Sequence, residues 1–214
     1  MNMDNNKTKY VVTVGRQFGS GGREIGKLIA KGLDIAYYDK ELLTEAAKSS
    51  GVNADFFEAA DERTPSFFSS LWSFNTGYNN GTYFMGDTPL SNDSIYKAQS
   101  DVMLKLADRG PCVIVGRTAD YILRNYCKVV SVFIHASMEA RIARIIARGD
   151  CDNAKDAEAM AEKKNKLRAE YYNFYTDKKW GEAQSYNLCI DSSLFGAQET
   201  AQIIIDFIKK RIAQ

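Results

Sequence analysis

The chain has 214 residues, of which 45% are hydrophobic and 26% charged, and its formal net charge is +1. These values predict one soluble globular domain, or one domain with a sizeable insertion, and they argue against a general nucleic-acid-binding protein. No apolar run approaches the roughly 20 residues of a membrane-spanning helix, and the polar start MNMDNNKTKY has no hydrophobic signal core. We therefore expect a cytoplasmic protein without a membrane or nucleic-acid partner. Its four cysteines form no C-x-x-C pair, so we expect reduced thiols and no zinc site.

A glycine-rich turn links the first predicted strand to the first predicted helix, within YVVTVGRQFGSGGREIG at residues 10–26. The β-branched run after Tyr10 predicts a strand that ends at Gly15, and residues 22–33 have the apolar spacing of a helix. Such a junction directs several backbone N–H groups and the positive end of the helix dipole toward one point. The turn therefore predicts a phosphate-binding site.

The rest of the chain alternates predicted strands with predicted helices. Further strands are expected at 35–38, 112–116, 129–135 and 186–190. Further helices are expected at 40–50, 54–61, 94–109, 118–125, 138–148, 153–175 and 197–212. Residues 62–92 show no regular pattern, and their aromatic side chains either form a lid or contact surface or simply pack the insertion onto the body. Short apolar strands that alternate with helices predict an α/β fold, with helices on both faces of a parallel sheet.

Ligands of open α/β sheets bind at the carboxyl ends of the strands, so the residues at these ends are candidate site residues. These residues are Gly15 and Arg16, Asp39, Gly116 and Arg117, residues 135–137 and residues 191–193. The single histidine, His135, is among them, and a lone histidine at the end of an apolar strand is more often structural than catalytic.

Two patterns of phosphate-binding loop compete for the glycine turn. The dinucleotide pattern G-x-G-x-x-G is met at its first two glycines and has an acid, Asp39, after the second strand, but Glu24 replaces its third glycine. The nucleoside-triphosphate pattern G-x-x-x-x-G-K-[ST] places Arg16 at its first glycine, Gly22 at its lysine and Arg23 at its Ser/Thr. Neither pattern is complete, so the loop alone does not decide between them.

Basic residues further along the chain favour phosphoryl transfer over hydride transfer, because cations stabilise the charge that spreads over the oxygens of a transferred phosphoryl group. They are Arg117 after the third strand, Arg141, Arg144 and Arg148 on one helix face, and Lys163, Lys164, Lys166 and Arg168 on the long charged helix. Most of these lysines are also compatible with a solvated helix face stabilised by Glu–Lys pairs.

The order of these features, from Val11 to about Arg211, resembles the nucleoside monophosphate kinases and most of all the cytidylate kinase-like group. The loop VTVGRQFGSGGREIG is similar to the GSGGRE-type loop of that group. Other segments resemble cytidylate kinase motifs: the strand-ending Asp in YDKEL (38–42), Gly-Arg at 116–117, HASMEAR (135–141), the LID arginine at Arg168 and IDSS (190–193).

The resemblance implies a three-layer α/β/α P-loop kinase fold with a five-stranded parallel sheet. It implies a single domain over 1–214 with its core at 8–40, 110–150 and 184–214, an acceptor-binding helical insertion at 41–109 and a LID at 149–183. The implied reaction transfers the γ-phosphoryl group of ATP, with Mg²⁺, to CMP or a related small phosphate acceptor.

The resemblance also implies roles for individual residues. The donor phosphates would be held by Arg16, Gly19, Ser20, Gly21, Gly22, Arg23 and Glu24. The acceptor would be held by Asp39, Arg117 and Thr118. The charge that develops during transfer would be stabilised by Arg23, Arg117, Arg141, Arg144, Arg148 and Arg168. No metal ligand is predicted.

The loop departs from the triphosphate pattern because Gly22 stands in place of the lysine, so that Arg23 would have to serve instead. Three other functions stay open. The chain could be a weak or inactive nucleotide-binding protein that acts on a protein partner through its aromatic insertion, a kinase for another small acceptor, or an NAD-linked enzyme. An exposed aromatic face at 67–74 would also predict a homodimer.

Overall fold

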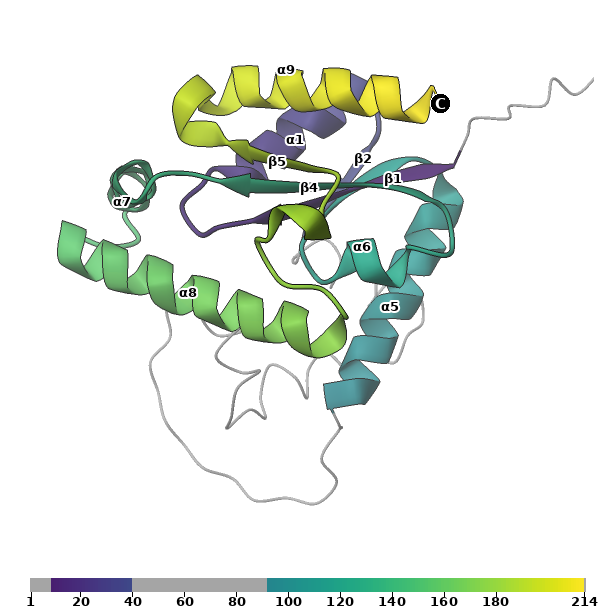
Figure 1. The fold of residues 1–214 in the computed structure, drawn as a ribbon, viewed down its shortest axis with the longest axis horizontal. Helices are drawn as coiled ribbons and strands as arrows, with labels where there is room; N and C mark the ends of the chain where they lie inside the picture. The colour runs from purple at the N-terminus through teal and green to yellow at the C-terminus, as the bar shows by residue number, and fades with distance from the viewer. Residues whose placement is uncertain (1–8, 40–91, 214) are drawn as a thin grey trace, which may run out of the picture.

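The computed structural model describes residues 9–39 and 92–213, and Figure 1 shows the arrangement of their helices and strands. The helices expected at 40–50 and 54–61 lie outside the described residues. The aromatic part of the insertion, and the homodimer contact expected through it, lie outside them too.

One sheet of five parallel strands crosses the described part of the chain in the order β2-β3-β1-β4-β5. The strands are β1 (Tyr10–Arg16), β2 (Ala36–Tyr38), β3 (Cys112–Val115), β4 (Lys128–His135) and β5 (Leu188–Asp191). The central strand β1 pairs with β3, with Val14 opposite Val115, and with β4, with Arg16 opposite Ile134. This register brings the carboxyl ends of β1, β3 and β4 to the same edge of the sheet, and it confirms the predicted parallel sheet.

Helices cover both faces of the sheet, which makes three layers (Figure 1). They are α1 (Gly22–Leu33), α5 (Asn92–Arg109), α6 (Ala119–Ile122), α7 (Met138–Ala147), α8 (Ala154–Tyr175) and α9 (Ser192–Ile212), with a short 3-10 helix, η1 (Ala183–Ser185). Helices α1 and α9 pack together on one face, whereas α5 and α6 pack on the other and α8 runs below it. The predicted α/β architecture is therefore confirmed.

The central strand is apolar because both of its faces are buried. Val12 and Val14 pack with α1 and α9, whereas Val11 points to the opposite face and packs with α5 and α6. Fully buried isoleucines such as Ile29 and Ile204 complete the core, and each contributes about 1.5–3 kcal/mol of stabilisation relative to an exposed side chain. The core thus holds the edge of the sheet, where the strands end, in a rigid arrangement.

Three element boundaries differ from the expected ones. Helix α6 covers only Ala119–Ile122, and it cannot begin earlier because the two residues before it adopt positive φ angles that no helix can include. Strand β5 begins at Leu188 rather than two residues earlier. Helix α9 begins already at Ser192, where the Asp191 side chain caps it, and it contains a break at Gly196 (φ 71°, ψ 178°).

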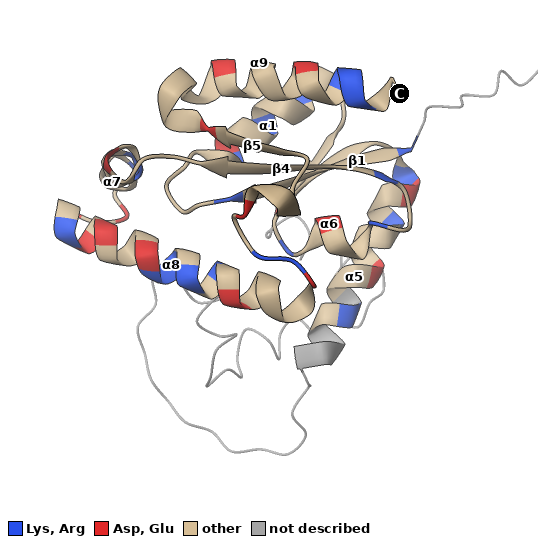
Figure 2. Ribbon diagram, in the orientation of Figure 1, with Lys and Arg blue, Asp and Glu red and all other residues tan. Residues whose placement is uncertain are grey.

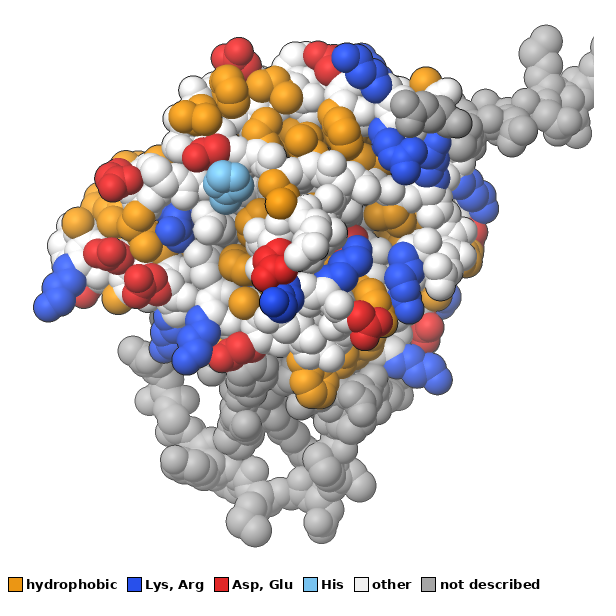
Figure 3. All heavy atoms as spheres, in the orientation of Figure 1, with side chains coloured by type: hydrophobic (Ala, Val, Ile, Leu, Met, Phe, Trp, Pro, Cys, Tyr) orange, Lys and Arg blue, Asp and Glu red, His pale blue; other side chains and the backbone are white. Residues whose placement is uncertain are grey.

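The surface carries charges of both signs. On the face shown in Figure 3, acidic and basic side chains are interspersed, and Figure 2 shows both signs along α8. No helix among the described residues is long and apolar enough to cross a membrane.

Candidate functional site

The turn between β1 and α1 forms a glycine loop with an open helix end. Gly19 (φ 81°) and Gly21 (φ 76°) adopt left-handed backbone conformations that a side chain would strain. A Cβ at Gly19 would also lie 2.9 Å from the Cβ and the carbonyl oxygen of Arg141. Gly21 precedes α1 without a side-chain hydrogen bond that caps the helix. The first N–H groups of α1 therefore point toward the site expected to bind phosphate.

Hydrogen bonds from three sides fix the shape of this loop. Within the loop, the Ser20 hydroxyl donates to the Gln17 carbonyl oxygen at 2.9 Å. From α9, the Ser192 hydroxyl donates to the Ser20 carbonyl oxygen at 2.7 Å. From α8, the Asn165 side-chain oxygen accepts from the Phe18 N–H at 2.7 Å. The loop is therefore preorganised, and Asn165 sets the position of α8 relative to it.

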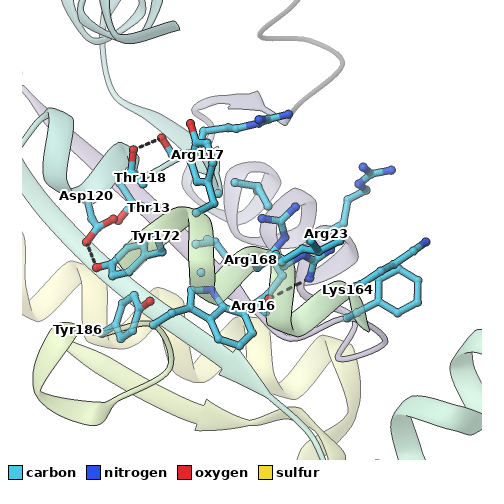
Figure 4. Close-up of a pocket in the computed structure, with 18 residues that line it drawn as sticks. Thr13, Arg16, Arg23, Arg117, Thr118, Asp120, Lys164, Arg168, Tyr172 and Tyr186 are labelled. Atoms are coloured by element: carbon cyan, nitrogen blue, oxygen red, sulfur yellow. Dashed lines mark hydrogen bonds between the residues drawn. The ribbon is translucent and has the colours of Figure 1, made fainter. Parts of the chain in front are cut away.

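A pocket lies beside the loop, at the carboxyl ends of β1 and β3 and against α8 (Figure 4). We call one part of its wall the cationic end, which consists of Arg16, Arg23, Arg117, Lys164 and Arg168. We call the other part the aromatic end, which consists of Thr13, Asp120, Tyr172, Trp180 and Tyr186. The pocket thus joins segments that are up to 173 residues apart in sequence, from Thr13 to Tyr186.

Like charges are held close together at the cationic end. Burial and the charges of Arg23 and Arg117 lower the pKa of Arg16 to about 10. Burial, followed by the charges of Arg16 and Arg23, lowers the pKa of Arg168 well below its usual value. The Arg168 Nη1 donates to the Arg16 carbonyl oxygen at 3.0 Å, so the two arginines are held side by side (Figure 4). Because like charges lie close together here, an anionic ligand would relieve their repulsion.

The second strand contributes an acid to the edge of this cluster. Asp39 is buried, and its Oδ2 lies 3.6 Å from the Nε of Arg23. The Tyr37 hydroxyl donates to the same oxygen at 3.3 Å. Burial and the Asp39 carboxylate raise the pKa of Tyr37, so its proton stays in this hydrogen bond. The acceptor residue expected at the end of the second strand therefore lies beside the expected donor residue Arg23.

The end of β3 turns sharply, with three successive positive φ angles at Gly116 (83°), Arg117 (61°) and Thr118 (54°). Such a conformation is costly for a β-branched threonine, and strain of this kind is typical of functional sites. The guanidinium carbon of Arg117 lies 5.9 Å from the centre of the Tyr171 ring. Thr118 is buried and hydrogen-bonds the Tyr96 hydroxyl at 3.1 Å. The turn thus sets Arg117 against α8.

The aromatic end contains a buried carboxylate with partners inside the protein. The Tyr172 hydroxyl donates to Asp120 Oδ2 at 2.7 Å, and Lys178 Nζ lies 3.4 Å from the same oxygen. Burial and the carboxylate raise the pKa of Tyr172. Trp180 meets the Phe133 ring edge-on, with 5.1 Å between the ring centres. This end therefore presents hydroxyl groups and ring faces, and its carboxylate is paired within the protein.

Three of the arginines expected to stabilise charge do not line the pocket. Arg144 donates to the carbonyl oxygens of Gly19 and Ser192 at 3.4 and 3.3 Å, so it links the loop to α9. Arg148 pairs with an aspartate two residues later. Arg141 is buried, and its Nε and Nη1 have no hydrogen-bond partner among the described residues. Their role in transfer stays a prediction.

Sequence reasoning missed other residues of the pocket. Lys164 is named among the basic residues of its helix but not among the expected site residues, yet it lines the pocket and its Nζ lies 4.1 Å from the centre of the Phe18 ring. Asp120 follows Arg117 by three residues, a spacing that was a usable signal for a shared site. The aromatic residues of α8 had no such signal, because their helix is too irregular in apolar spacing to reveal its buried face.

The loop fits a chain of phosphates better than the described side chains fit a metal ion. Among the residues described, no three His, Cys, Asp or Glu side chains gather as metal ligands. The Ser20 hydroxyl is buried and donates within the loop, and Glu24 is exposed. A magnesium site made of side chains is therefore not supported by this donor set, whereas glycine backbone, an open helix end and arginines fit phosphate.

Comparisons with known proteins agree with this geometry. A family model described as the cytidylate kinase-like family matches residues 11–194. A crystal structure of an uncharacterized protein from Eubacterium ventriosum ATCC 27560 has a TM-score of 0.70 and 28% identity, and the match covers 95% of this chain and 99% of that one. A search of curated proteins finds no match.

Two kinases of known name share the fold at low identity. The shikimate kinase from Acinetobacter baumannii in complex with shikimate has a TM-score of 0.51 and 14% identity, and 95% and 94% of the two chains are covered. A gluconokinase from Sinorhizobium meliloti 1021 has a TM-score of 0.52 and 14% identity, and 97% and 98% are covered. At such identities these structures bear only on the fold.

Proposed function

The chain belongs to the cytidylate kinase-like family, and from this premise we propose that it transfers the γ-phosphoryl group of ATP to CMP or a related small phosphate acceptor. The observation that carries the proposal is the cationic end of the pocket, where five basic side chains meet beside the open N-terminus of α1. Phosphoryl transfer needs little covalent chemistry from the protein, but it needs cations and N–H groups placed around the transferred group. Hydride transfer needs fewer cations, because no phosphoryl group is transferred and no charge develops on one.

In the proposed reaction the donor phosphates lie along the glycine loop, over the N-terminus of α1. Arg117 holds the acceptor phosphate, and Asp39 holds the sugar or base of the acceptor. An oxygen of the acceptor phosphate forms a bond to the γ-phosphorus while the bond from that phosphorus to the β–γ bridging oxygen breaks, so that ADP leaves. Arg168 and Lys164, on α8, neutralise charge on the transferred group. Any Mg²⁺ bound with the nucleotide would be held mainly by the phosphates and would supply further charge neutralisation.

The proposal also assigns roles to the segments of the domain. Residues 149–183, which include α8, act as the LID, and residues 41–109 act as the acceptor-binding insertion. The Asn165 contact to the loop is consistent with a LID that closes against the donor site. No nucleic acid or membrane takes part, and the reaction is one of the cytoplasm.

A coupled assay of ADP release tests this proposal. Purified protein is mixed with ATP, Mg²⁺ and, one at a time, CMP, dCMP, UMP, AMP and GMP, with shikimate and gluconate as acceptors without phosphate. We expect turnover with at least one pyrimidine monophosphate. Release of ADP with none of the acceptors, from protein that is folded by circular dichroism, would contradict the proposed enzyme.

A nucleotide-binding protein without turnover is the second candidate. It is favoured by one feature, which is Gly22 at the place of the loop lysine. Calorimetry with ATP separates the two candidates. Tight ATP binding without turnover would favour the binding protein, provided that Arg23→Ala changes only the affinity for ATP. Such a protein would then act on a partner through its insertion.

A further inference from the structure

The Arg16 side chain runs across the glycine loop and fills the space beside two glycines. A Cβ built on Gly22 would lie 2.5 Å from the Cβ of Arg16 and 2.8 Å from its Cγ. A Cβ built on Gly116 would overlap the Nη1 of Arg16. The stem of Arg16 therefore lies against Gly22, and its guanidinium lies against the end of β3.

The two ends of this path coincide with two positions of the triphosphate loop pattern. Arg16 stands where the pattern has its first glycine, and Gly22 stands where it has its lysine. Gly22 is the first residue of α1, without a positive φ angle, so its backbone would accept a lysine. What excludes a side chain there is the stem of Arg16. Relative to the pattern, the cation and the glycine have exchanged places.

Arg23, the expected substitute for the lysine, lies on the more exposed side of the cationic end. Its Nε is engaged at 3.6 Å from Asp39, at the end of β2, and 44% of its side chain is exposed. Arg16 is less exposed: its carbonyl oxygen accepts from Arg168 (Figure 4), and its Nη1 lies against Gly116, the residue before Arg117. Of the two, Arg16 reaches from the glycine loop, where the donor phosphates are expected, to the end of β3, where the acceptor phosphate is expected.

We propose that Arg16 performs the task of the missing loop lysine and binds the outer phosphates of the donor nucleotide. This inference rests on the proposed function, because it assigns one of the groups that would bind the donor. A guanidinium binds phosphate through two parallel N–H groups, which is compatible with its different path into the site. Its charge persists at neutral pH, since its lowered pKa is still about 10.

Exchanging the two residues tests the inference. We compare wild type with Arg16→Gly, Gly22→Lys and the double variant Arg16→Gly/Gly22→Lys, by calorimetry with inorganic tripolyphosphate and by ADP release with ATP. We expect each single variant to lose about tenfold to 100-fold in tripolyphosphate affinity, the first from loss of the cation and the second from the clash with the Arg16 stem. The double variant restores the pattern, and we expect it to bind within about tenfold of wild type.

Three controls keep the outcome interpretable. Lys31→Ala removes an exposed charge at the far end of α1 and should leave binding unchanged. Arg16→Met keeps an apolar stem against Gly22, so it tests the loss of charge if Arg16→Gly does not fold. Thermal unfolding identifies any variant that is not folded.

Failure of the inference differs from failure of the proposed function. If wild type binds tripolyphosphate but turns over no acceptor, the enzyme proposal fails and the role of Arg16 in phosphate binding is still measured by the variants. If folded Arg16→Met binds tripolyphosphate as tightly as wild type, the inference is wrong. It is also wrong if the folded double variant binds no better than either single variant.

Discussion

The two ends of the pocket treat buried charge in opposite ways. At the aromatic end, the carboxylate of Asp120 has partners within the protein, since Tyr172 donates to it and Lys178 lies 3.4 Å away. At the cationic end, Arg16 and Arg168 are desolvated beside other cations, and their pKa values fall as a result. The carboxylate of the aromatic end is thus paired within the protein, whereas the cationic end gathers like charges that a bound anion would stabilise. The difference indicates that the aromatic end stabilises the fold and the cationic end binds the ligand.

Loss of a cation should have the largest effect on activity. We expect Arg168→Met to lower kcat/KM by about 100-fold to 1000-fold, because it removes a charge that would stabilise the transferred group. The measurement is steady-state ADP release with the best acceptor. Lys166→Ala, on the exposed side of the same helix, is the matched control and should keep wild-type kinetics. An equal fall in kcat/KM in both variants would mean that α8 acts only through its net charge and not through the position of Arg168.

Loss of the buried acid should affect stability more than ligand binding. We expect Asp120→Asn to destabilise the fold by about 1–3 kcal/mol, because Tyr172 and Lys178 lose a charged partner. Thermal unfolding measures this loss. Tripolyphosphate affinity should stay within about twofold of wild type, as the change is at the other end of the pocket. A large loss of affinity without a loss of stability would remove the distinction between the two ends.

A loop anchor should affect both properties by a smaller amount. Ser192→Ala removes the hydrogen bond to the Ser20 carbonyl oxygen, and we expect a loss of about 1 kcal/mol, which is a fall of about 2–4 °C in the midpoint of thermal unfolding. Tripolyphosphate affinity should fall with it, because the loop is less well ordered. Ser137→Ala removes the N-cap of α7 at a similar cost in stability. This control should leave tripolyphosphate affinity unchanged. A loss of affinity in both variants would mean that lower stability alone reduces binding.

The smallest effect concerns pH. The pKa of Arg16 is lowered to about 10, so its charge is fully present at neutral pH and is lost as the pH rises through about 10. We therefore expect tripolyphosphate affinity to decline toward pH 10 more steeply in wild type than in Arg16→Met. In the ligand-free protein, the pH dependence of the free energy of unfolding has the opposite sign. Because the folded state binds fewer protons than the unfolded state above about pH 10, this group favours folding more as the pH rises. Calorimetry and thermal unfolding across this range measure the two slopes.

Much of the fold could be predicted from local patterns. The runs at 11–15 and 112–116 are rich in β-branched apolar residues and predicted β1 and β3, and the apolar spacing at 138–148 predicted α7. Each of these signals depends on neighbours within one turn of helix or one strand. The family resemblance rested on the order of such segments, and the match over residues 11–194 confirms it.

The sequence by itself determined the parallel α/β sheet, the glycine loop and the cations available at the strand ends, because spacing and residue type decide these features locally. Only the tertiary structure decided which cations meet. It placed Arg16 against Gly22 and Lys164 in the pocket, and it placed Arg144 between the loop and α9. These contacts join segments far apart in the chain, and they depend on how β1, β3 and α8 pack, which no local pattern contains.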